Sequence, residues 1–208
     1  GVCVRRGGRA VGGPAGVADA ADAVDVLAAV GELIKIFKKA AALESAYAPV
    51  VLHGDPGDSC APLYYGGAYE QLKEYVDSGA INVISDNDCI GWSIAEATKH
   101  VENAMSIANS EGITIDAVLS PNDGLASGAI AALGDETAKQ TIITGMDCEV
   151  AACQRILAGT QSMTVFGDSR EMGKVAVDVA AEFVKNGSYK AARPFNIATL
   201  ADVSDAAN

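Results

Sequence analysis

Short β-type runs alternate with helix-patterned segments along most of this chain of 208 residues, and this alternation limits the fold more than any other feature. The β-type runs are residues 50–53, 81–84, 115–119, 141–143 and 163–166. Between them, apolar residues recur at helical spacing, for example Ala97, Val101 and Ala104. Strands and helices in this order form parallel sheets, and right-handed crossovers place helices on both faces. The sequence therefore predicts the α/β class with a doubly wound parallel sheet.

The first 46 residues follow a different pattern. Residues 1–16 are rich in Gly, Arg and Val, and residues 18–46 form an alanine-rich stretch. In that stretch Leu27, Val30 and Ile34 recur at helical spacing, which predicts a long helix. The glycines before it match neither the P-loop pattern nor the dinucleotide-binding glycine pattern, so a nucleotide site is not indicated.

Charge and hydrophobic pattern argue against two classes of partner. Lys and Arg number 15 against 27 Asp and Glu, and the net charge of −12 would repel nucleic-acid phosphates. No uncharged apolar run is long enough to span a membrane, and residues 1–16 lack the apolar block of a secretory signal. We expect neither nucleic-acid binding nor a membrane span, and an exported form would already have lost its signal.

Patterns typical of catalysis and metal binding are thin. The sequence has no zinc-protease or nucleophile-elbow motif, and His53 and His100 lack the spacing of metal ligands. Five cysteines are present, an odd number that leaves at least one thiol outside any intramolecular disulfide, and we expect them to be small buried residues. Cys148 and Cys153 stand five apart on a predicted helix, about one and a half turns, so no disulfide is predicted between them. Nothing here indicates an enzyme, a cofactor or a metal.

Polar and aromatic side chains follow three of the predicted strands where each strand ends. Trp92 follows the second run, Asn122 and Asp123 follow the third, and Asp147 follows the fourth. Because ligands bind at the carboxyl ends of parallel strands, we expect Trp92, Asn122 and Asp147 to face one cleft. An aromatic ring with amide and carboxylate oxygens suits a sugar, which has an apolar C–H face and hydroxyls. A second interpretation stays open, in which Asn122 or Asp123 only caps the helix 125–133.

Five motifs occur in a fixed order: HGDPGD at 53–58, YVDSG at 75–79, VLSPNDG at 118–124, GMD at 145–147 and AGTQSMTV at 158–165. In this order and spacing they resemble the type I periplasmic sugar-binding proteins of ABC transporters. The resemblance is greatest to the xylose-binding and multiple-monosaccharide-binding branch, and it extends over about residues 50–203.

This resemblance implies two doubly wound lobes, joined by a three-segment hinge, that close around a monosaccharide such as xylose or glucose. It implies binding without catalysis, a periplasmic or other extracytoplasmic location, and a membrane permease of an ABC transporter as partner. Trp92 would stack on the sugar ring, and Asn122 and Asp147, with Asp123 beside them, would contact the hydroxyls.

The resemblance also divides the chain. Residues 1–164 correspond to a carboxyl-terminal-type lobe with an atypical 1–46, residues 165–192 to a helix of the other lobe, and residues 193–208 to a return segment and tail. Residues 2–4 would open the lobe. Gly7 and Gly8 stand where relatives place polar ligand residues, and Gly167 stands where they often place a Lys. We therefore expect a chain without most of the amino-terminal lobe and with weakened sugar binding.

Two further expectations follow from the resemblance. The helix expected at 168–186 has an apolar stripe of Met172, Val175, Val179 and Phe183, and relatives pack this stripe on the amino-terminal lobe. Left uncovered, the stripe would favour a homo-oligomer. The alternative function is a sensor or interaction domain of the same fold in a sugar-responsive regulator. A helix-turn-helix near the amino terminus would favour it, and the sequence has no clear helix pair there.

Overall fold

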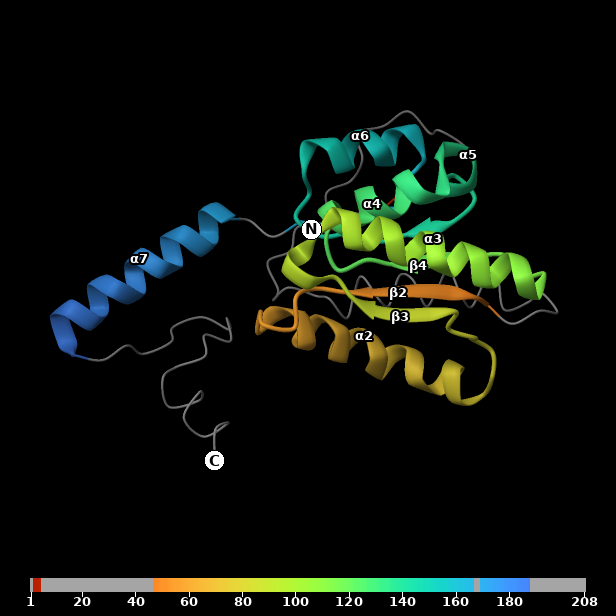
Figure 1. Cartoon of the computed structure of the whole chain (residues 1–208). Coiled ribbons are helices and arrows are strands. Elements are labelled where there is room, and N and C mark those ends of the chain that lie inside the picture. The colour runs from red at the N-terminus through yellow and green to blue at the C-terminus, as the bar shows by residue number, and fades with distance from the viewer. Residues whose placement is uncertain (1, 5–46, 167–168, 188–208) are drawn as a thin grey trace. The chain divides into compact units, whose positions relative to one another are not determined.

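The computed structural model describes residues 2–4, 47–166 and 169–187 (Figure 1). Residues 2–4 and 47–166 belong to one compact unit, and residues 169–187 belong to a second. The helix predicted at 18–46 lies outside the described residues, as do Gly7, Gly8, Gly167 and the tail 193–208. What the sequence suggested for them stays a prediction.

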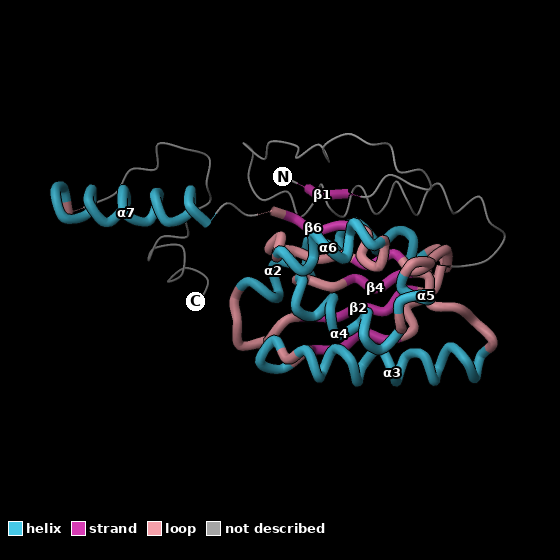
Figure 2. The backbone as a smooth tube through the Cα atoms, turned by 90° about the horizontal axis from the view of Figure 1, so that it is seen from above, coloured by secondary structure: helices cyan, strands magenta, loops and turns pink. Residues whose placement is uncertain are grey.

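Four parallel strands form the main sheet of the first unit, in the spatial order β3, β2, β4, β5. They are β2 (Pro49–His53), β3 (Ser85–Asp88), β4 (Ala117–Leu119) and β5 (Ile142–Ile143). After β5, a parallel bridge between Met146 and Val165 connects the chain to β6 (Met163–Val165). β1 (Val2–Val4) pairs antiparallel with β6, beside which Figure 2 shows it. The predicted α/β class with a parallel sheet is confirmed.

Helices cover both faces of the sheet. In Figure 1, α2 (Cys60–Asp77) lies on one face, and α3 (Ile94–Glu111) and α4 (Asp123–Leu133) lie on the other. Successive strand residues point to opposite faces, so each strand contributes to two separate cores. Val50, Leu52 and Val118 are buried with residues of α3 and α4, whereas Val51, Leu119 and Met163 are buried with residues of α2.

Local capping explains where the helices begin and end. Asn122 caps α4, because its Oδ1 accepts a hydrogen bond from the backbone N–H of Leu125 at 2.8 Å. Ser93 caps α3 in the same way, and α3 ends at Gly112. Two further helices are α5 (Asp135–Ala138) and α6 (Val150–Ala158). The helix predicted at 125–133 is confirmed, and so is its cap at Asn122.

Helices α3 and α4 approach each other closely at one glycine. A Cβ on Gly128 of α4 would lie 2.5 Å from the carbonyl oxygen of Ile94 and 3.1 Å from the Cβ of Ala97. Thr98 Oγ1 donates a hydrogen bond to the Gly128 carbonyl oxygen at 3.1 Å across the same contact. Only a residue without a side chain fits this position, and the contact fixes α4 on the sheet.

The strand predicted at 81–84 is displaced toward the carboxyl terminus. Ile81 forms only an isolated bridge with Tyr47, whereas β3 covers Ser85–Asp88 and pairs with β2 residue by residue. β3 lies at an edge of the sheet, and its side chains alternate between half-buried and exposed. An edge strand tolerates charged residues because solvent reaches them, so the hydrophobic pattern does not mark it. The acidic stretch 86–88 therefore lies within the strand and not after it.

Candidate functional site

Trp92 lies after β3, in a short 3₁₀ turn, Ile90–Trp92, that leads into α3. Its indole Nε1 donates a hydrogen bond to Asp58 Oδ2 at 3.2 Å. Its six-membered ring lies against Gly54, where a Cβ would overlap the ring atoms. The half-buried ring also packs against the core between the sheet and α3. The indole is therefore held between the loops that follow β2 and β3.

Asp55 joins these two loops. Its carboxylate accepts hydrogen bonds from the backbone N–H of Gly57, at 2.6 Å, and from the backbone N–H of Gly91. Gly91 has φ 67°, a left-handed conformation that glycine adopts without a steric penalty. The short turn that carries Trp92 is thus positioned by the loop of the neighbouring strand.

Asn122 lies three residues after the last residue of β4 and is half-buried. Its side-chain oxygen serves the α4 cap, and its backbone carbonyl accepts a hydrogen bond from Ser120 Oγ at 2.9 Å. With Oδ1 used in this way, the amide Nδ2 is the group that Asn122 would offer to a ligand.

Asp147 and Cys148 form a tight turn between β5 and α6. Their φ angles are 100° and 56°, and their backbone N–H groups donate to the Val165 carbonyl (2.9 Å) and Thr164 Oγ1 (3.1 Å). Partial burial, with the nearby charges of Asp123 and Glu149, raises the pKa of the Asp147 carboxyl above its ordinary value. Asp147 remains an exposed residue, so solvent reaches its side chain.

No disulfide links Cys148 and Cys153, as predicted, but the geometric reason for that prediction and the expected burial of Cys60 are wrong. Cys148 lies before the first residue of α6, and its Sγ is 3.6 Å from Cys153 Sγ, so the two side chains do meet. The prediction assumed that one regular helix carries both residues, and the left-handed turn at Cys148 removes that assumption. Cys89 is buried as expected, but Cys60 is exposed at the start of α2.

The described non-glycine residues with left-handed backbone lie at this end of the sheet. Of the non-glycine residues that the structure describes, Trp92, Asp147 and Cys148 are those with positive φ. Such conformations cost roughly 1–3 kcal/mol each and are typical of ligand sites and switch regions. Two of the four residues selected from the sequence therefore have an unusual backbone as well as suitable side chains.

Asp123 is fully buried and connects three elements. Its Oδ1 accepts a hydrogen bond from Gln161 Nε2 at 2.8 Å. Its Oδ2 accepts from Thr164 Oγ1 at 2.9 Å and from the backbone N–H of Glu149 at 3.0 Å. Arg155 completes the cluster by donating to the Asp123 carbonyl oxygen and to Gln161 Oε1. This network fixes the start of α4 against β6 and the start of α6.

Tyr64 of α2 was not selected from the sequence, although it lies close to the same carboxylates. It is 7% exposed, and burial raises the pKa of its hydroxyl, with further contributions from the charges of Asp123 and Asp147. Tyr64, Ala68 and Leu72 recur every four residues and are all buried. This four-residue spacing is the sequence signal that could have placed Tyr64 on the buried face of α2.

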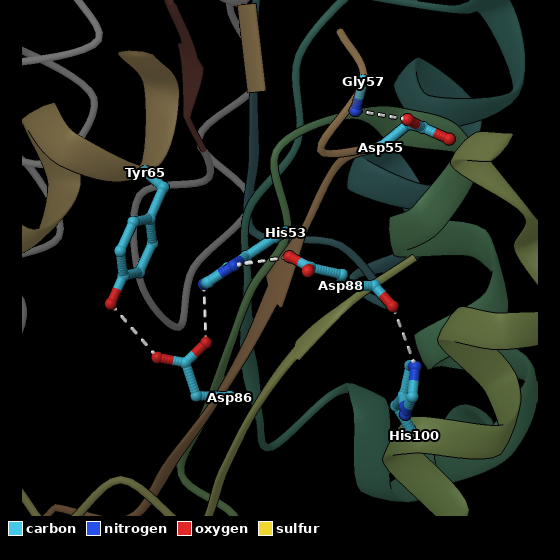
Figure 3. A network of polar contacts seen from close by, with 7 residues as sticks. All are labelled: His53, Asp55, Gly57, Tyr65, Asp86, Asp88 and His100. Atoms are coloured by element: carbon cyan, nitrogen blue, oxygen red, sulfur yellow. Dashed lines mark hydrogen bonds and ion pairs between the residues drawn. The ribbon is translucent and has the colours of Figure 1, made fainter. Parts of the chain in front are cut away.

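A second polar cluster joins β2, β3 and α2 (Figure 3). His53 Nδ1 lies 3.0 Å from Asp88 Oδ1, and His53 Nε2 lies 2.6 Å from Asp86 Oδ1, within ion-pair distance. Tyr65 donates to Asp86 Oδ2 at 3.2 Å, and burial together with the Asp86 charge raises the pKa of Tyr65 to about 12. This cluster compensates the acidic side chains of the edge strand. This cluster was not predicted, because the strand was expected at 81–84 and residues 86–88 therefore after it.

The four residues selected from the sequence all lie at the carboxyl end of the sheet. Asn122, Asp123 and Asp147 lie together, since the Asp123 backbone N–H donates to the Met146 carbonyl oxygen at 2.9 Å. Trp92 lies across β2 from them, because β2 separates β3 from β4. Within the described ranges, no group of three or more His, Cys, Asp or Glu is placed to hold a metal ion, and no helix is long and apolar enough to span a membrane.

Comparison with known sequences gives one family and several relatives. The chain matches the family model of the periplasmic binding protein domain over residues 20–188. It is 37% identical over 147 residues to the D-xylose-binding periplasmic protein of Escherichia coli. The matched region covers 70% of this chain and 44% of that protein. A multiple sugar-binding periplasmic receptor of Rhizobium radiobacter is 38% identical over 137 residues, covering 61% of this chain and 38% of the receptor. The chain thus spans less than half the length of these two relatives.

A solved structure has the same fold. An ABC transporter solute binding protein from Clostridium phytofermentans, with bound β-D-glucose, superposes with a TM-score of 0.68 at 30% identity. The superposition covers 85% of this chain and 57% of that protein.

Proposed function

Because this chain belongs to the family of periplasmic binding proteins, as its five motifs indicate, we propose that it binds a monosaccharide as the solute-binding component of an ABC transporter. Xylose and glucose are the first candidates, since the relatives named above bind xylose, several sugars or glucose. The protein captures its ligand and does not transform it.

Trp92 is the observation that carries this proposal. The hydrogen bond to Asp58 holds the indole ring on Gly54, and the backbone of Trp92 is left-handed. The ring is therefore fixed before any ligand binds. The C–H face of a pyranose packs on an indole ring of this kind. A preorganised platform reduces the entropy that binding would otherwise lose.

Polar groups beside the ring supply the hydroxyl contacts. The Asp147 carboxylate accepts hydrogen bonds from hydroxyls, and the Asn122 Nδ2 donates to a hydroxyl oxygen. Asp123, also expected to contact the ligand, has a different role in this proposal: its buried carboxylate holds the loops of Asn122 and Asp147 in place.

The surroundings of the protein follow from its relatives. Periplasmic relatives support an extracytoplasmic location, and the permease of an ABC transporter is the proposed partner. We also propose residues 1–164 as the carboxyl-terminal-type lobe, a division supported by the end of the first compact unit at Phe166. The described site residues come from this one unit, so we expect affinity in roughly the millimolar range for the chain alone.

The test uses the single tryptophan of the chain, which is Trp92 itself. Intrinsic fluorescence is recorded during titration with D-xylose, D-glucose, D-galactose and L-arabinose, and with acyclic sorbitol as a control for hydroxyl density. We expect a saturable change with at least one pyranose and none with sorbitol. A response that stays linear with every sugar contradicts the proposal, and micromolar binding contradicts the expected weak affinity.

Matched variants assign the contacts. Asp147→Asn is expected to weaken the affinity for the tightest-binding sugar by about tenfold, since a charge-assisted hydrogen bond contributes about 1.5 kcal/mol or more. Asp135→Asn, which changes an exposed carboxylate in the first turn of α5, is expected to leave the titration unchanged. Equal effects of the two substitutions would show that Asp147 has no specific contact.

The sensor domain of a sugar-responsive regulator, the alternative raised from the sequence, would use the same site. Sugar titration does not separate the two functions. Binding of the sugar-loaded chain to membranes that contain a cognate permease supports the transport role, and its absence favours the regulator.

A further inference from the structure

The turn that carries Asp147 also carries a pair of thiols in contact. Cys148 Sγ and Cys153 Sγ lie 3.6 Å apart, on either side of the start of α6 at Val150. The left-handed φ of Cys148 directs the chain so that this side chain returns toward the second turn of the helix. Cys153 is fixed there by its backbone N–H, which donates to the Glu149 carbonyl oxygen at 3.0 Å.

The geometry lies within reach of a disulfide bond. Sulfur atoms in a disulfide are about 2.05 Å apart, so formation of the bond needs the two atoms to approach by roughly 1.5 Å. Both residues are partly exposed, so a small oxidant reaches them. Among the other cysteines whose side chains are described, Cys89 is fully buried, and Cys60 is exposed at the first residue of α2.

We propose that Cys148 and Cys153 form a reversible disulfide that locks the Asp147 turn. The oxidant is a disulfide, either a small molecule such as oxidised glutathione or a disulfide oxidoreductase. The thiolate of one cysteine attacks this disulfide, forms a mixed disulfide and displaces one thiol. The second cysteine then attacks the mixed disulfide at the protein sulfur and displaces the other thiol. Two protein thiols and one external disulfide thus become one protein disulfide and two external thiols.

The bridge acts on a segment that is already held at three consecutive backbone groups. The N–H groups of Asp147, Cys148 and Glu149 donate to Val165, Thr164 and Asp123 in that order. A covalent link from Cys148 to α6 opposes relaxation of the two left-handed residues. An effect of the bridge on sugar affinity rests on the function proposed above, whereas formation of the bridge does not. An extracytoplasmic location would favour the oxidised form.

The test counts thiols in the full chain. The protein is reduced, freed of reductant and incubated with oxidised glutathione, and thiols are then counted by maleimide labelling and intact mass before and after. The reduced chain has five thiols. We expect oxidation to remove two of them without a glutathione adduct, and peptide mapping to recover a linked Cys148–Cys153 pair. Dithiothreitol is expected to restore both.

Serine variants locate the bond. Cys60→Ser is expected still to lose two thiols on oxidation. In Cys148→Ser and Cys153→Ser, the remaining cysteine of the pair is expected to keep its thiol or to carry a glutathione adduct. Circular dichroism confirms that each variant is folded, and if one serine variant does not fold, peptide mapping of the unmodified chain decides alone. The proposal is overturned if the oxidised chain keeps all five thiols, or if Cys148 or Cys153 is linked to another residue.

Sugar titration of the two redox forms separates this inference from the proposed function. A bridge that forms in a chain without any sugar response leaves the thiol pair established and removes the sugar role. Sugar binding by a chain that forms no bridge supports the sugar role and overturns the proposed disulfide. If both hold, the oxidised form is expected to bind more tightly, because its Asp147 turn is preorganised.

Discussion

At the scale of single residues, two neighbouring carboxylates are used in opposite ways. The Asp123 carboxylate is fully buried and accepts three hydrogen bonds within the protein, whereas Asp147 is exposed and lies on a left-handed turn. The first determines the shape of the strand-end loops, and the second is available to a ligand.

Asp123→Asn is expected to destabilise the protein by roughly 2 kcal/mol or more, although the side chain keeps its size. Both carboxylate oxygens accept hydrogen bonds, so either orientation of the amide directs an N–H group at a donor. Urea unfolding followed by circular dichroism measures the change. Asp135→Asn, at an exposed position, is the control and is expected to stay within about 0.5 kcal/mol. A loss equal to that of the control would mean that the buried network does not stabilise the fold.

Asp147→Asn is expected to stabilise the protein at neutral pH. Burial and the charges of Asp123 and Glu149 raise the pKa of Asp147, so its ionised form is disfavoured in the folded state. This destabilisation is present above the folded-state pKa and disappears as the pH falls below the ordinary pKa of the carboxyl. The difference in urea midpoint between the variant and the parent chain should therefore shrink on acidification.

Glu136→Gln is the matched control, because the pKa of Glu136 is shifted in the opposite direction to that of Asp147. The hydrogen bond and charge of Lys139 lower the pKa of Glu136, so its ionised form is favoured in the folded state. Removing that charge is expected to give no gain at neutral pH. If both substitutions gave the same gain, the stabilisation would come from the lower net charge and not from the surroundings of Asp147.

At the scale of elements, contacts close in sequence were predictable and contacts set by turns were not. The pattern of residues 117–124, apolar residues followed by Asn122 and Asp123, predicted β4 and the α4 cap correctly, because both depend on neighbouring residues. The predicted position of β3 was wrong, because an edge strand pairs through its backbone and needs no apolar residues.

The geometry around α6 was not predictable for a different reason. Asp147 and Cys148 have left-handed backbone, and neither residue type signals this as glycine does. The contact between Cys148 and Cys153 depends on that turn, as does the distance between Asp147 and Asp123. Residue types at the site could therefore be selected from the sequence, but which carboxylate faces inward could not.

Gly128→Ala is expected to destabilise the protein by about 1–3 kcal/mol, because the new Cβ overlaps the Ile94 carbonyl oxygen and separates α4 from α3. Gly124→Ala in the same helix is the control. Its Cβ would have Asn122 Oδ1 as nearest atom at 3.6 Å, so alanine is expected to be neutral or to stabilise the helix by up to about 1 kcal/mol. Thermal unfolding of both variants checks the difference, and equal melting temperatures would contradict the close helix contact.

At the scale of the whole molecule, surface charge and exposed apolar residues oppose each other. The net charge of −12 favours separate molecules by mutual repulsion. The second unit contains α7 (Ser169–Asn186), the helix expected from the sequence, and its Val177, Phe183 and Val184 are 69%, 57% and 88% exposed. Of the stripe expected from the sequence, Phe183 is exposed, whereas Val175 and Val179 are only partly exposed. The homo-oligomer therefore stays a proposal, and exposed apolar residues are the argument for it.

Salt is expected to promote this association, because it screens the repulsion and leaves the apolar contacts intact. Light scattering coupled to size-exclusion chromatography should show a larger average mass at high ionic strength than at low. The double variant Val177→Ser, Phe183→Ser should remain monomeric under both conditions. A monodisperse monomer of the parent chain at every salt concentration would contradict the expectation.

The buried Asp123 network has a practical consequence for redesign of the site. Libraries that aim at a new sugar specificity can vary Asp147, a proposed sugar contact whose charge opposes folding, whereas changes at Asn122 would also remove the α4 cap. Such libraries should keep Asp123, Gln161 and Thr164 unchanged. A selection that randomised all of these positions together would mostly return unfolded clones, and the loss would be mistaken for a narrow tolerance of the binding site itself.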